Sequence, residues 1–576
     1  MATNNPKTAT RQVTVTRFGG IADHAGLALD AAMDVRNFRI LSDGTLEKRC
    51  GYDRHYTFPD PLRGLWEGVV SGESYFFAVA GNQIYMRTQD ATAPRAIYTM
   101  TTSTGEVSFF LYRERLWLMD GTSLLLFRPG TQTFSMGLGY APLYGYNWHP
   151  TALGEVNEPL NLARNEIRVH YFNSNGSTTF NLPFTTRKIR GLWVNGASVV
   201  NFSFKMGTST FTIPTELATV GTVEVWVTLD ASFNSRPAVL EASCAKVYQT
   251  PHREVMMCHN PNAGYLVYRT TPVTDEMLKT CNLTIADADP MYIAKDTAFA
   301  VGSSAHPVTA LCQYENHMLV FNDESVWSIG YPSSLSDDAE ILPVRAGLGC
   351  TANGGVILGG KYPIAVTQAG IARLKFSGYD LDYCQPEILS AGIRNRFDKD
   401  FLRRAVLFWD KFRQELWVRD PNDSAGSAWI CDPERDVWFR FDDVPAKRFF
   451  PFEGNVGFAD ETDLYCFEES LETDNGRDFT AEYLSHALDS SRLSPPRRSL
   501  RLSVVAEKAE DALFTQIRTD RATKTLALSA QTPSPSVPTR FDRRLAMGRF
   551  HILQYLIVAA GQSRCRIYSY SLAANP

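Results

Sequence analysis

Three kinds of residue pattern in the sequence could do chemistry. In the first, Gly347, Gly349 and Ala352 in GLGCTA fit the G-x-G-x-x-A variant of the dinucleotide-binding fingerprint. In that fingerprint the glycines let the backbone approach a pyrophosphate, and a strand must precede them and a helix must follow. Here the chain continues as NGGVILGG, which is not typical of a helix. The pattern therefore favours glycines that serve turns over a cofactor site.

The second stretch, PHREVMMCH, holds His252, Cys258 and His259. These are metal-ligating residue types, but their spacing matches no closed zinc pattern and no second pair of ligands lies nearby in the sequence. A partly buried histidine pair is the simpler interpretation. We expect no metal site.

The third kind of candidate is a pair of neighbouring carboxylates, Asp337 with Asp338 or Asp442 with Asp443. Two carboxylates that face one groove could hydrolyse a glycosidic bond. Adjacent residues on a strand point to opposite faces, however, so these pairs are more typical of solvated turns. The chain also lacks a G-x-S-x-G elbow, a P-loop and an H-E-x-x-H motif. The sequence therefore predicts no enzyme and no cofactor.

One charge feature stands out between residues 492 and 549. This stretch has twelve Lys or Arg and five Asp or Glu, in a chain whose net charge is -5. Such a local excess indicates a surface that faces nucleic acid or an acidic partner subunit, although a solvated face of incidental sign would have the same composition. The side chains expected on this surface are Arg497, Arg498, Arg501, Arg518, Arg521, Lys524, Arg540, Arg543, Arg544 and Arg549.

The elements that must position these residues are predicted to be short strands. Two apolar runs at 318–321 and 326–329 are separated by NDES, whose side chains cap turns, which predicts a hairpin. The sequence up to 377 repeats this device, with glycines between the apolar runs. Too few residues intervene for crossover helices, so the pattern indicates antiparallel sheet.

The strand pattern also repeats on a larger scale. Residues 62–137 contain eight strand candidates in two units, each of about forty residues, which is the size of a propeller blade. Similar units begin at 112, 314 and 410, each with a turn that carries Asp, and a shorter one begins at 456. The repeat predicts a β-propeller-like core of four-stranded blades. Generic hairpins in a β-sandwich are the alternative.

The whole chain is therefore predicted to be all-β, with five segments. Residues 1–60 form a lead-in and first strands, 61–137 and 248–445 form the two parts of the propeller, 138–247 form an inserted β-sandwich, and 446–576 form a C-terminal β platform. The insertion is inferred from its clean apolar-polar alternation and its NSNGS and VNGAS turns. Within the lead-in, LDAAMDVRNFRI is either an amphipathic helix or an extended segment. A short helix is expected to start over 274–278, and 531–540 is a Pro/Ser-rich loop.

Length and composition limit the class of protein. A chain of 576 residues is too long for one core, so two to four domains are expected. Its ten cysteines are scattered singly, which favours reduced thiols over a disulfide framework. The N-terminus has no apolar signal region, and the longest apolar stretch, at 552–560, is too short to span a bilayer. We expect a soluble chain made in the cytoplasm.

Several segments resemble one known family. NFRI-LSDGTLEKRCGYDR and LRGLW…YFFAVAGNQIY are similar to the start of the virion proteins that form the tail tube of short-tailed bacteriophages, called nozzle, hub or tail-stabilisation proteins. ALCQYENHMLVFNDESVWSI…ARLKFSG resembles their most recognisable region, and FTAEYLSHALDSSRL…RIYSYSL resembles the β platform after their propeller. YFNSNGSTTFNLPF…LWVNGASV is similar to small β modules of phage tail and fibre proteins.

This resemblance implies a structural virion protein of the phage tail, assembled in the host cytoplasm. It implies a ring of identical copies, usually six-fold, below a portal or adaptor ring, with contacts to tail fibres or other tail proteins and transient passage of double-stranded DNA. A head-to-tail ring needs heterologous interfaces that close on themselves. The basic region at 492–549 would then face DNA or an acidic neighbouring ring. The alternative is a glycan-binding or glycan-degrading propeller, a lectin or depolymerase, which needs a groove lined by converging carboxylates and aromatic residues.

Overall fold

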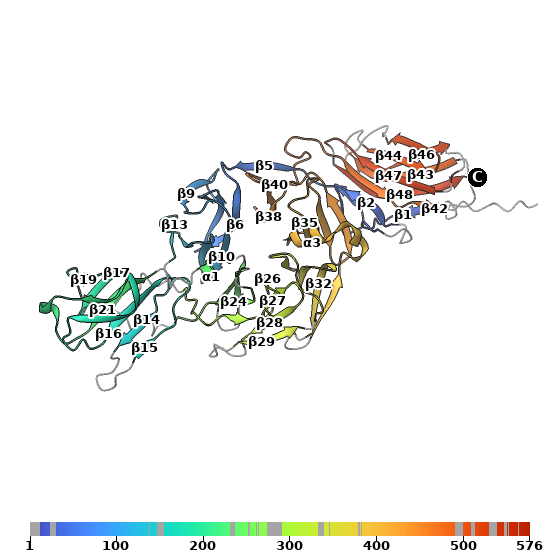
Figure 1. Cartoon of the computed structure of the whole chain (residues 1–576). Helices are drawn as coiled ribbons and strands as arrows, with labels where there is room; N and C mark the ends of the chain where they lie inside the picture. The colour runs from blue at the N-terminus through green and yellow to red at the C-terminus, as the bar shows by residue number, and fades with distance from the viewer. Residues whose placement is uncertain are drawn as a thin grey trace, which may run out of the picture. The chain divides into compact units, whose positions relative to one another are not determined.

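The computed structural model describes most of the chain (Figure 1). The described residues are 12–23, 30–137, 139–146, 155–230, 237–242, 244–250, 254–260, 262, 264–273, 291–331, 339–344, 346–377, 381, 383–489, 499–508, 513–528, 538–546, 550, 552–562 and 564–575. By its internal contacts the chain divides into two compact units. One comprises 1–62, 355–375 and 385–576, and the other comprises 63–354 and 376–384.

The fold is all-β, as predicted, and its β-propeller-like core consists of four-stranded sheets, most of which are built from consecutive strands. Six such sheets are present in the described part of the chain, and a seventh set, β34–β37, continues into a ten-stranded sheet. The strands are β6 (Leu62–Val70), β7 (Glu73–Ala80), β8 (Gln83–Thr88), β9 (Arg95–Thr99), β10 (Ser108–Tyr112), β11 (Arg115–Met119), β12 (Leu124–Arg128), β13 (Thr133–Met136), β22 (Cys244–Gln249), β23 (Glu254–His259), β24 (Leu266–Arg269), β25 (Phe299–Ala300), β26 (Val308–Tyr314), β27 (His317–Asn322), β28 (Val326–Gly330), β29 (Glu340–Val344), β30 (Val356–Gly359), β31 (Tyr362–Thr367), β32 (Gly370–Ser377), β33 (Tyr383–Ile388), β34 (Val406–Asp410), β35 (Glu415–Arg419), β36 (Ala428–Asp432), β37 (Val437–Phe441), β38 (Arg448–Phe452), β39 (Asn455–Ala459), β40 (Asp463–Phe467) and β5 (Tyr52–Thr57).

A repeated turn closes the hairpins of these sheets. The residue that begins each turn is Asp120, Asn322, Asp410, Asp432 or Asp460, and its side-chain oxygen accepts hydrogen bonds from the backbone N–H groups two and three residues further on, at 2.5–3.2 Å. An Asx side chain that bonds in this way takes the place of a backbone turn. The turns at Asp120, Asn322 and Asp460 lie where the sequence repeat has its Asp-bearing turn, and the turn at Asn322 closes the predicted hairpin between β27 and β28.

The last of these sheets is completed by a strand from the other end of the chain. β5 pairs antiparallel with β40, so that Tyr52 lies opposite Phe467. The ring of Tyr52 packs edge-on against Phe458, Tyr465 and Phe467, with ring centroids 5.0–5.6 Å apart. Aromatic contacts of this kind add to the free energy gained by burial of the rings. The sheet therefore needs both the N-terminal and the C-terminal part of the sequence.

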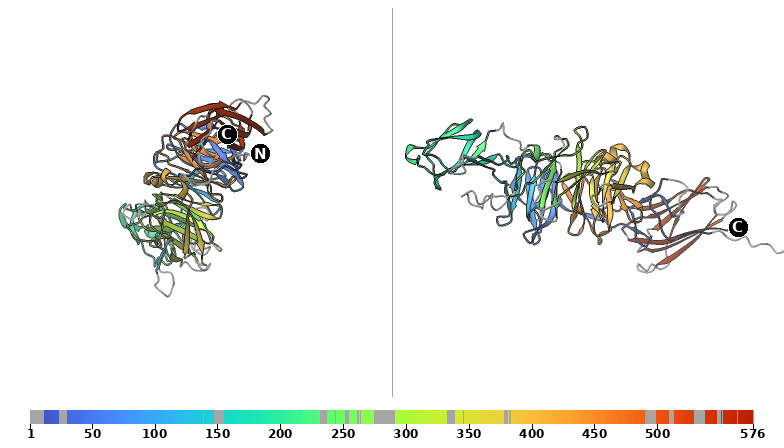
Figure 2. Two further views of the ribbon diagram at one scale, coloured as in Figure 1. Left: turned by 90° about the vertical axis from the view of Figure 1, so that its right-hand side faces the viewer. Right: turned by 90° about the horizontal axis from the view of Figure 1, so that it is seen from below.

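The C-terminal part forms a pair of sheets that also contains the first four strands of the chain. One sheet has the order β3-β4-β48-β43-β46, with β1 beside β48, and the other runs β2-β41-β47-β44-β45 from β37, with β42 beside β47. Figure 2 shows the N-terminal strands (blue) beside the C-terminal strands (red). We call this pair of sheets the C-terminal sandwich. Its strands are β1 (Gln12–Val15), β2 (Ala32–Arg36), β3 (Phe38–Ile40), β4 (Leu46–Lys48), β41 (Ala481–Ser485), β42 (Leu488–Asp489), β43 (Ser499–Lys508), β44 (Leu513–Thr519), β45 (Thr523–Ala527), β46 (Thr539–Ala546), β47 (Ile552–Ala559) and β48 (Cys565–Asn575).

Aromatic rings hold the two sheets of the C-terminal sandwich together. Tyr483 on β41 and Tyr555 on β47 come from one sheet, and Tyr570 on β48 comes from the other. The ring centroids of Tyr555 and Tyr570 are 4.2 Å apart, and Phe18 packs against Tyr483 at 5.0 Å.

Of the two conformations left open for LDAAMDVRNFRI, the structure has the extended one, because β2 and β3 are strands of this sandwich.

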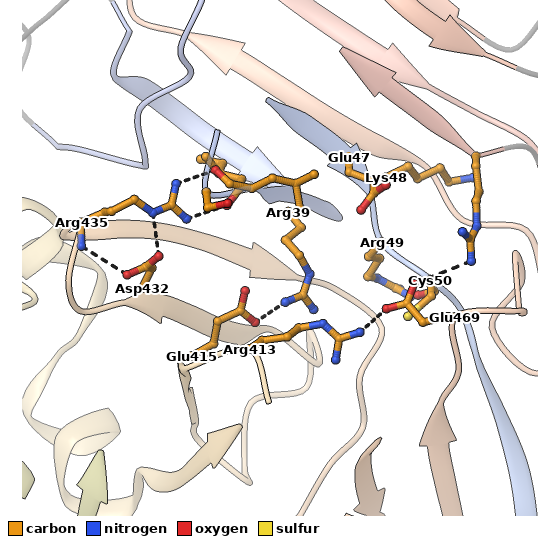
Figure 3. A pocket seen from close by; sticks show the side chains of 14 residues that line it. Arg39, Glu47, Lys48, Arg49, Cys50, Arg413, Glu415, Asp432, Arg435 and Glu469 are labelled. Atoms are coloured by element: carbon orange, nitrogen blue, oxygen red, sulfur yellow. Dashed lines mark hydrogen bonds and ion pairs between the residues drawn. The ribbon is translucent and has the colours of Figure 1, made fainter. Parts of the chain in front are cut away.

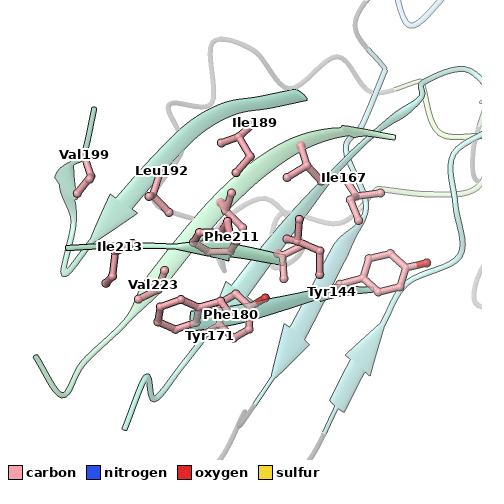
Figure 4. Packing of buried hydrophobic residues seen from close by; sticks show 14 of the residues in the cluster. Tyr144, Ile167, Tyr171, Phe180, Ile189, Leu192, Val199, Phe211, Ile213 and Val223 are labelled. Atoms are coloured by element: carbon pink, nitrogen blue, oxygen red, sulfur yellow. The ribbon is translucent and has the colours of Figure 1, made fainter. Parts of the chain in front are cut away.

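The insertion forms one eight-stranded sheet around its own core (Figure 4). Its strands are β14 (Leu143–Tyr146), β15 (Glu155–Asn157), β16 (Glu166–Tyr171), β17 (Thr179–Val194), β18 (Ala197–Ser198), β19 (Ser203–Phe204), β20 (Thr208–Thr212) and β21 (Val223–Leu229). The long strand β17 pairs with β20 through its first part and with β21 through its second, with register shifts between them. The sheet can therefore bend at β17, and Phe180, Leu192, Phe211 and Val225 enclose the core.

A buried asparagine ties the root of the insertion to a later segment. The Nδ2 group of Asn161 donates to the carbonyl oxygens of Tyr140 and Met291 at 2.7 and 2.9 Å. Its Oδ1 atom accepts from the backbone N–H groups of Ala163 and Ile293 at 2.9 and 3.0 Å. Three segments of the chain therefore meet at a single side chain that is fully hydrogen-bonded.

Helices are few and short in the described residues: α1 (Pro237–Leu240), α3 (Lys399–Arg404), and the 3-10 turns Thr215–Leu217 and Ala391–Arg396. None of them is long and apolar enough to cross a membrane. The helix expected to start over 274–278 lies outside the described residues, as do 531–537 of the Pro/Ser-rich loop. Nine cysteines are described, and all of them are free thiols.

Candidate interaction surface

The basic residues predicted from the sequence are distributed over both sheets of the C-terminal sandwich. Arg501 lies on β43, and Arg540, Arg543 and Arg544 lie on β46 of the same sheet. Arg518 lies on β44 and Lys524 on β45 of the other sheet, with Arg521 in the turn between them. Arg497, Arg498 and Arg549 lie outside the described residues.

The alternation along β43 and β46 decides which side chains face outward. Val504 and Phe541 lie opposite each other and are buried in the core of the sandwich. Successive side chains of a strand point to opposite faces. Arg501 and Arg544, which also lie directly opposite each other, therefore share the outer face. We call this the outer arginine face; it consists of Arg501, Ser503, Arg540, Asp542 and Arg544.

Asp542 organises two of the three arginines on this face. Its carboxylate accepts from Arg501 Nη2 at 2.9 Å and from Arg540 Nε at 3.2 Å, and the Ser503 hydroxyl also donates to it. Hydrogen bonding by Ser503, together with Arg501 and Arg540, lowers the pKa of the Asp542 carboxyl. Asp542 is therefore ionised at neutral pH. No partner of the Arg544 side chain is found in the described structure, so the face has three cations and one anion.

Two further basic residues have different environments. Lys524 donates to the carbonyl oxygen of Ala546 at the end of β46, so the edge strands of the two sheets meet there. Arg543 is half-buried on the inner side, opposite Leu502, and its Nη1 donates to the Asp542 carbonyl at 3.1 Å. The basic surface predicted from the sequence is thus divided, and Arg543 is not part of the outer arginine face.

A polar cavity of about 320 Å³ lies elsewhere in the same unit (Figure 3). The acids that line it are Glu47, Glu415, Asp432 and Glu469. Its ion pairs join Arg39 to Glu415, Arg435 to Asp432, and both Arg413 and Arg564 to Glu469. Burial raises the pKa of Glu415, and the adjacent Arg39 opposes that rise. Because three of the four acids are held by arginines, the lining lacks the two unpaired, converging carboxylates that glycoside hydrolysis needs.

The two glycines of the dinucleotide-like motif have separate roles: Gly347 has a positive φ of 68°, as a turn requires, and Gly349 makes a close packing contact. β30 follows them, and the helix that the fingerprint needs is not present there. A Cβ atom at Gly349 would lie 2.1 Å from the carbonyl oxygen of Asn322, so only glycine fits against this hairpin turn. The sequence-based preference for a turn role is consistent with this contact.

The remaining candidates from the sequence form no site in the described residues. His259 is fully buried, and burial lowers its pKa to about 4. No group of three His, Cys, Asp or Glu side chains in the described part of the chain could hold a metal ion. Asp442 is held by Arg36 and Arg440, and the carbonyl of Asp443 accepts from the Tyr52 hydroxyl. His252, Asp337 and Asp338 are not among the described residues.

Two residues of these sites were not singled out from the sequence. Asp542 was counted only as one of five acids that reduce the local charge, and Arg39 was not considered. The alternation in TRFDRRLA carries a signal for Asp542, because it places Asp542 on the same face as Arg540 and Arg544. Nothing local to Arg39 indicates Glu415, which is 376 residues away in the sequence.

Comparison with known proteins gives no family. No family model matches the chain, and no curated protein matches it. Among solved structures it is similar to the "AfRom2 CNH domain" (7% identity, 73% of this chain and 99% of that chain covered, TM-score 0.34). It is also similar to the WD40 domain of SCAP from fission yeast (8%, 75% and 98%, TM-score 0.32) and to BBS1N in complex with ARL6DN (9%, 73% and 98%, TM-score 0.34). Matches at this level carry no argument about function.

Proposed function

We propose that the chain is a structural protein of a short-tailed bacteriophage tail and catalyses no reaction. Copies of it form a ring-shaped nozzle or hub, six-fold in the family that it resembles, below the portal or adaptor ring. The ring conducts DNA during ejection and anchors fibres or other tail parts. Its place is the virion tail, after assembly in the host cytoplasm.

The observation that carries this proposal is the distribution of charge. The outer arginine face is exposed and has more cations than anions, whereas the acids of the polar cavity are largely held by arginines. Unbalanced charge on an exposed sheet suits contact with an anionic neighbour. Charges that are paired within a cavity are typical of contacts that stabilise the fold. Together with the resemblance of the sequence, this distribution favours an assembly role over a hydrolytic one.

The test is to image the purified chain with its portal ring by negative-stain electron microscopy and to measure its mass by mass photometry. The proposal predicts ring-shaped particles of several copies and no release of reducing sugar from host surface polysaccharide. A monomer that releases sugar would instead establish the glycan-degrading alternative.

A further inference from the structure

The described residues of the outer arginine face carry more positive than negative charge. Arg501 and Arg544 are directly opposite each other on β43 and β46. Like charges at directly opposed positions destabilise a sheet. Asp542 lies within reach of Arg501 and Arg540, so among the residues that the structure describes no acid pairs with Arg544. An anion that contacts Arg544 would therefore relieve a repulsion that the fold contains.

Two of the three guanidinium groups of this face, those of Arg501 and Arg540, are held in position by hydrogen bonds. Both oxygens of Asp542 are used, one by Arg501 and one by Arg540, and Arg540 Nη2 also donates to the Ser503 hydroxyl at 3.2 Å. The side chains of Arg501 and Arg540 are still 41% and 59% exposed, so their outward edges are accessible. A guanidinium fixed in this way can bind a carboxylate or a phosphate with little further loss of entropy.

Two features favour carboxylates over the phosphates of DNA. First, Asp542 is an ionised acid in the middle of the face, and it would repel a continuous row of phosphates, whereas faces of mixed sign are usual between proteins. Second, DNA must slide through a conduit, and fixed arginines that bind its phosphates would hold it in place.

We propose that the outer arginine face docks an acidic segment of a neighbouring protein subunit. This inference rests on the proposed function, because the assembly supplies the neighbour, and it decides between the two partners that the sequence left open. Arg540 and Arg544 are four residues apart on one face of β46, so they are separated by about 13 Å along the strand. The partner then presents two carboxylates at a similar spacing, as residues i and i+4 of an extended segment do.

The test uses the full chain and two labelled anionic probes, poly-L-glutamate and a short DNA duplex. Binding of each probe is followed by fluorescence anisotropy at low and at physiological salt. The variant is Arg544→Gln, and the matched control is Arg187→Gln, which removes an exposed arginine from β17 of the insertion. Both substitutions are on exposed strand positions, so the variants are expected to fold, and circular dichroism checks this.

We expect Arg544→Gln to weaken binding of poly-L-glutamate about fivefold, the size expected for loss of one surface ion pair, and Arg187→Gln to leave it unchanged. Binding of the DNA duplex should respond to neither variant. The inference is wrong if poly-L-glutamate does not bind, if the two variants weaken its binding equally, or if Arg544→Gln weakens binding of the duplex instead.

These outcomes are separable from a failure of the proposed function. A chain that forms rings but whose binding of poly-L-glutamate does not depend on Arg544 keeps its function and loses this docking face. A monomer that degrades polysaccharide but shows the Arg544 dependence keeps the docking face and loses the function.

Discussion

Arg49 and Asp474 form a buried, bidentate ion pair although 425 residues separate them in the sequence. The Arg49 side chain has no solvent exposure, and that of Asp474 is 6% exposed. Arg49 also donates to the Asn37 side chain at 3.0 Å and lies over the Phe479 ring at 3.9 Å. This guanidinium therefore joins the lead-in strands to the segment that precedes β41.

Removal of the acid from this pair should destabilise the protein strongly. We expect Asp474→Ala to lower the free energy of unfolding by about 3–5 kcal/mol, because a buried Arg49 would be left without a counter-charge. Urea denaturation measures the change. The control is Glu461→Ala, which breaks an exposed pair with Lys447 and should change stability far less. Equal effects of the two variants would show that Arg49 is accessible to water.

The Asn161 contacts should stabilise the root of the insertion. Asn161→Ala leaves the carbonyls of Tyr140 and Met291 without this donor, and we expect a loss of about 3 kcal/mol. Hydrogen exchange should accelerate at the amides of Ala163 and Ile293, which donate to Asn161. Asn201→Ala, at an exposed position, should leave exchange at these amides unchanged.

The repeated Asx turn makes a prediction about residue type. Asn322 occupies a position that is Asp in the other four turns, so Asn322→Asp should be nearly neutral. Asn322→Ala should destabilise by about 1 kcal/mol, because the N–H groups of Glu324 and Ser325 lose their acceptor. Thermal denaturation of the two variants compares them directly. If both lose the same stability, the side-chain oxygen is not what holds the turn.

The opposed arginines should lower the stability of the isolated chain. Replacement of Arg544 by Thr, a good strand former, should raise the free energy of unfolding by about 0.2–1 kcal/mol at low salt. The gain should shrink in high salt, which screens the repulsion from Arg501. Arg187→Thr on β17 serves as the control for the change in strand propensity. A salt-independent gain would assign the effect to propensity and not to charge.

Two buried histidines should lower the free energy of unfolding as the pH falls. Burial, with Arg168 nearby in the case of His170, lowers the pKa of His170 and of His259 to about 4, from 6.5 for the free side chain. Between these values the unfolded chain binds more protons than the folded chain does, so the contribution of these two histidines to stability falls as pH falls from 6.5 and levels off below about 4. His259→Leu should reduce the slope in this window. The control is Asn201→Leu, at an exposed position with no titratable side chain, and it should leave the slope unchanged.

Local pattern was enough to predict the elements, and it was not enough to predict how distant elements combine. The β27–β28 hairpin follows from two apolar runs and from the turn chemistry that begins at Asn322, all within a few residues. In contrast, LDAAMDVRNFRI is ambiguous by itself. This segment forms strands because β2 pairs with β41 and because Asp34 forms an ion pair with Arg440, 406 residues away.

The same limit applies to the candidate surface. The composition was enough to locate the excess of positive charge. It was not enough to predict that the Arg544 side chain faces outward whereas that of its neighbour Arg543 faces inward. That distinction depends on which face of β46 meets the core, and the core is set by the pairing with β43. Arg497, Arg498 and Arg549 lie outside the described residues, so their part in this surface stays a prediction.

The pairing of β5 with β40 has a consequence for biosynthesis. His55 on β5 meets Glu468 across 413 residues, so a ribosome produces this ribbon early and must translate most of the message before its neighbour emerges. Until then β5 has an unpaired edge, and unpaired strand edges favour aggregation. The sheet that contains β5 can therefore be completed only after β40 has been synthesised.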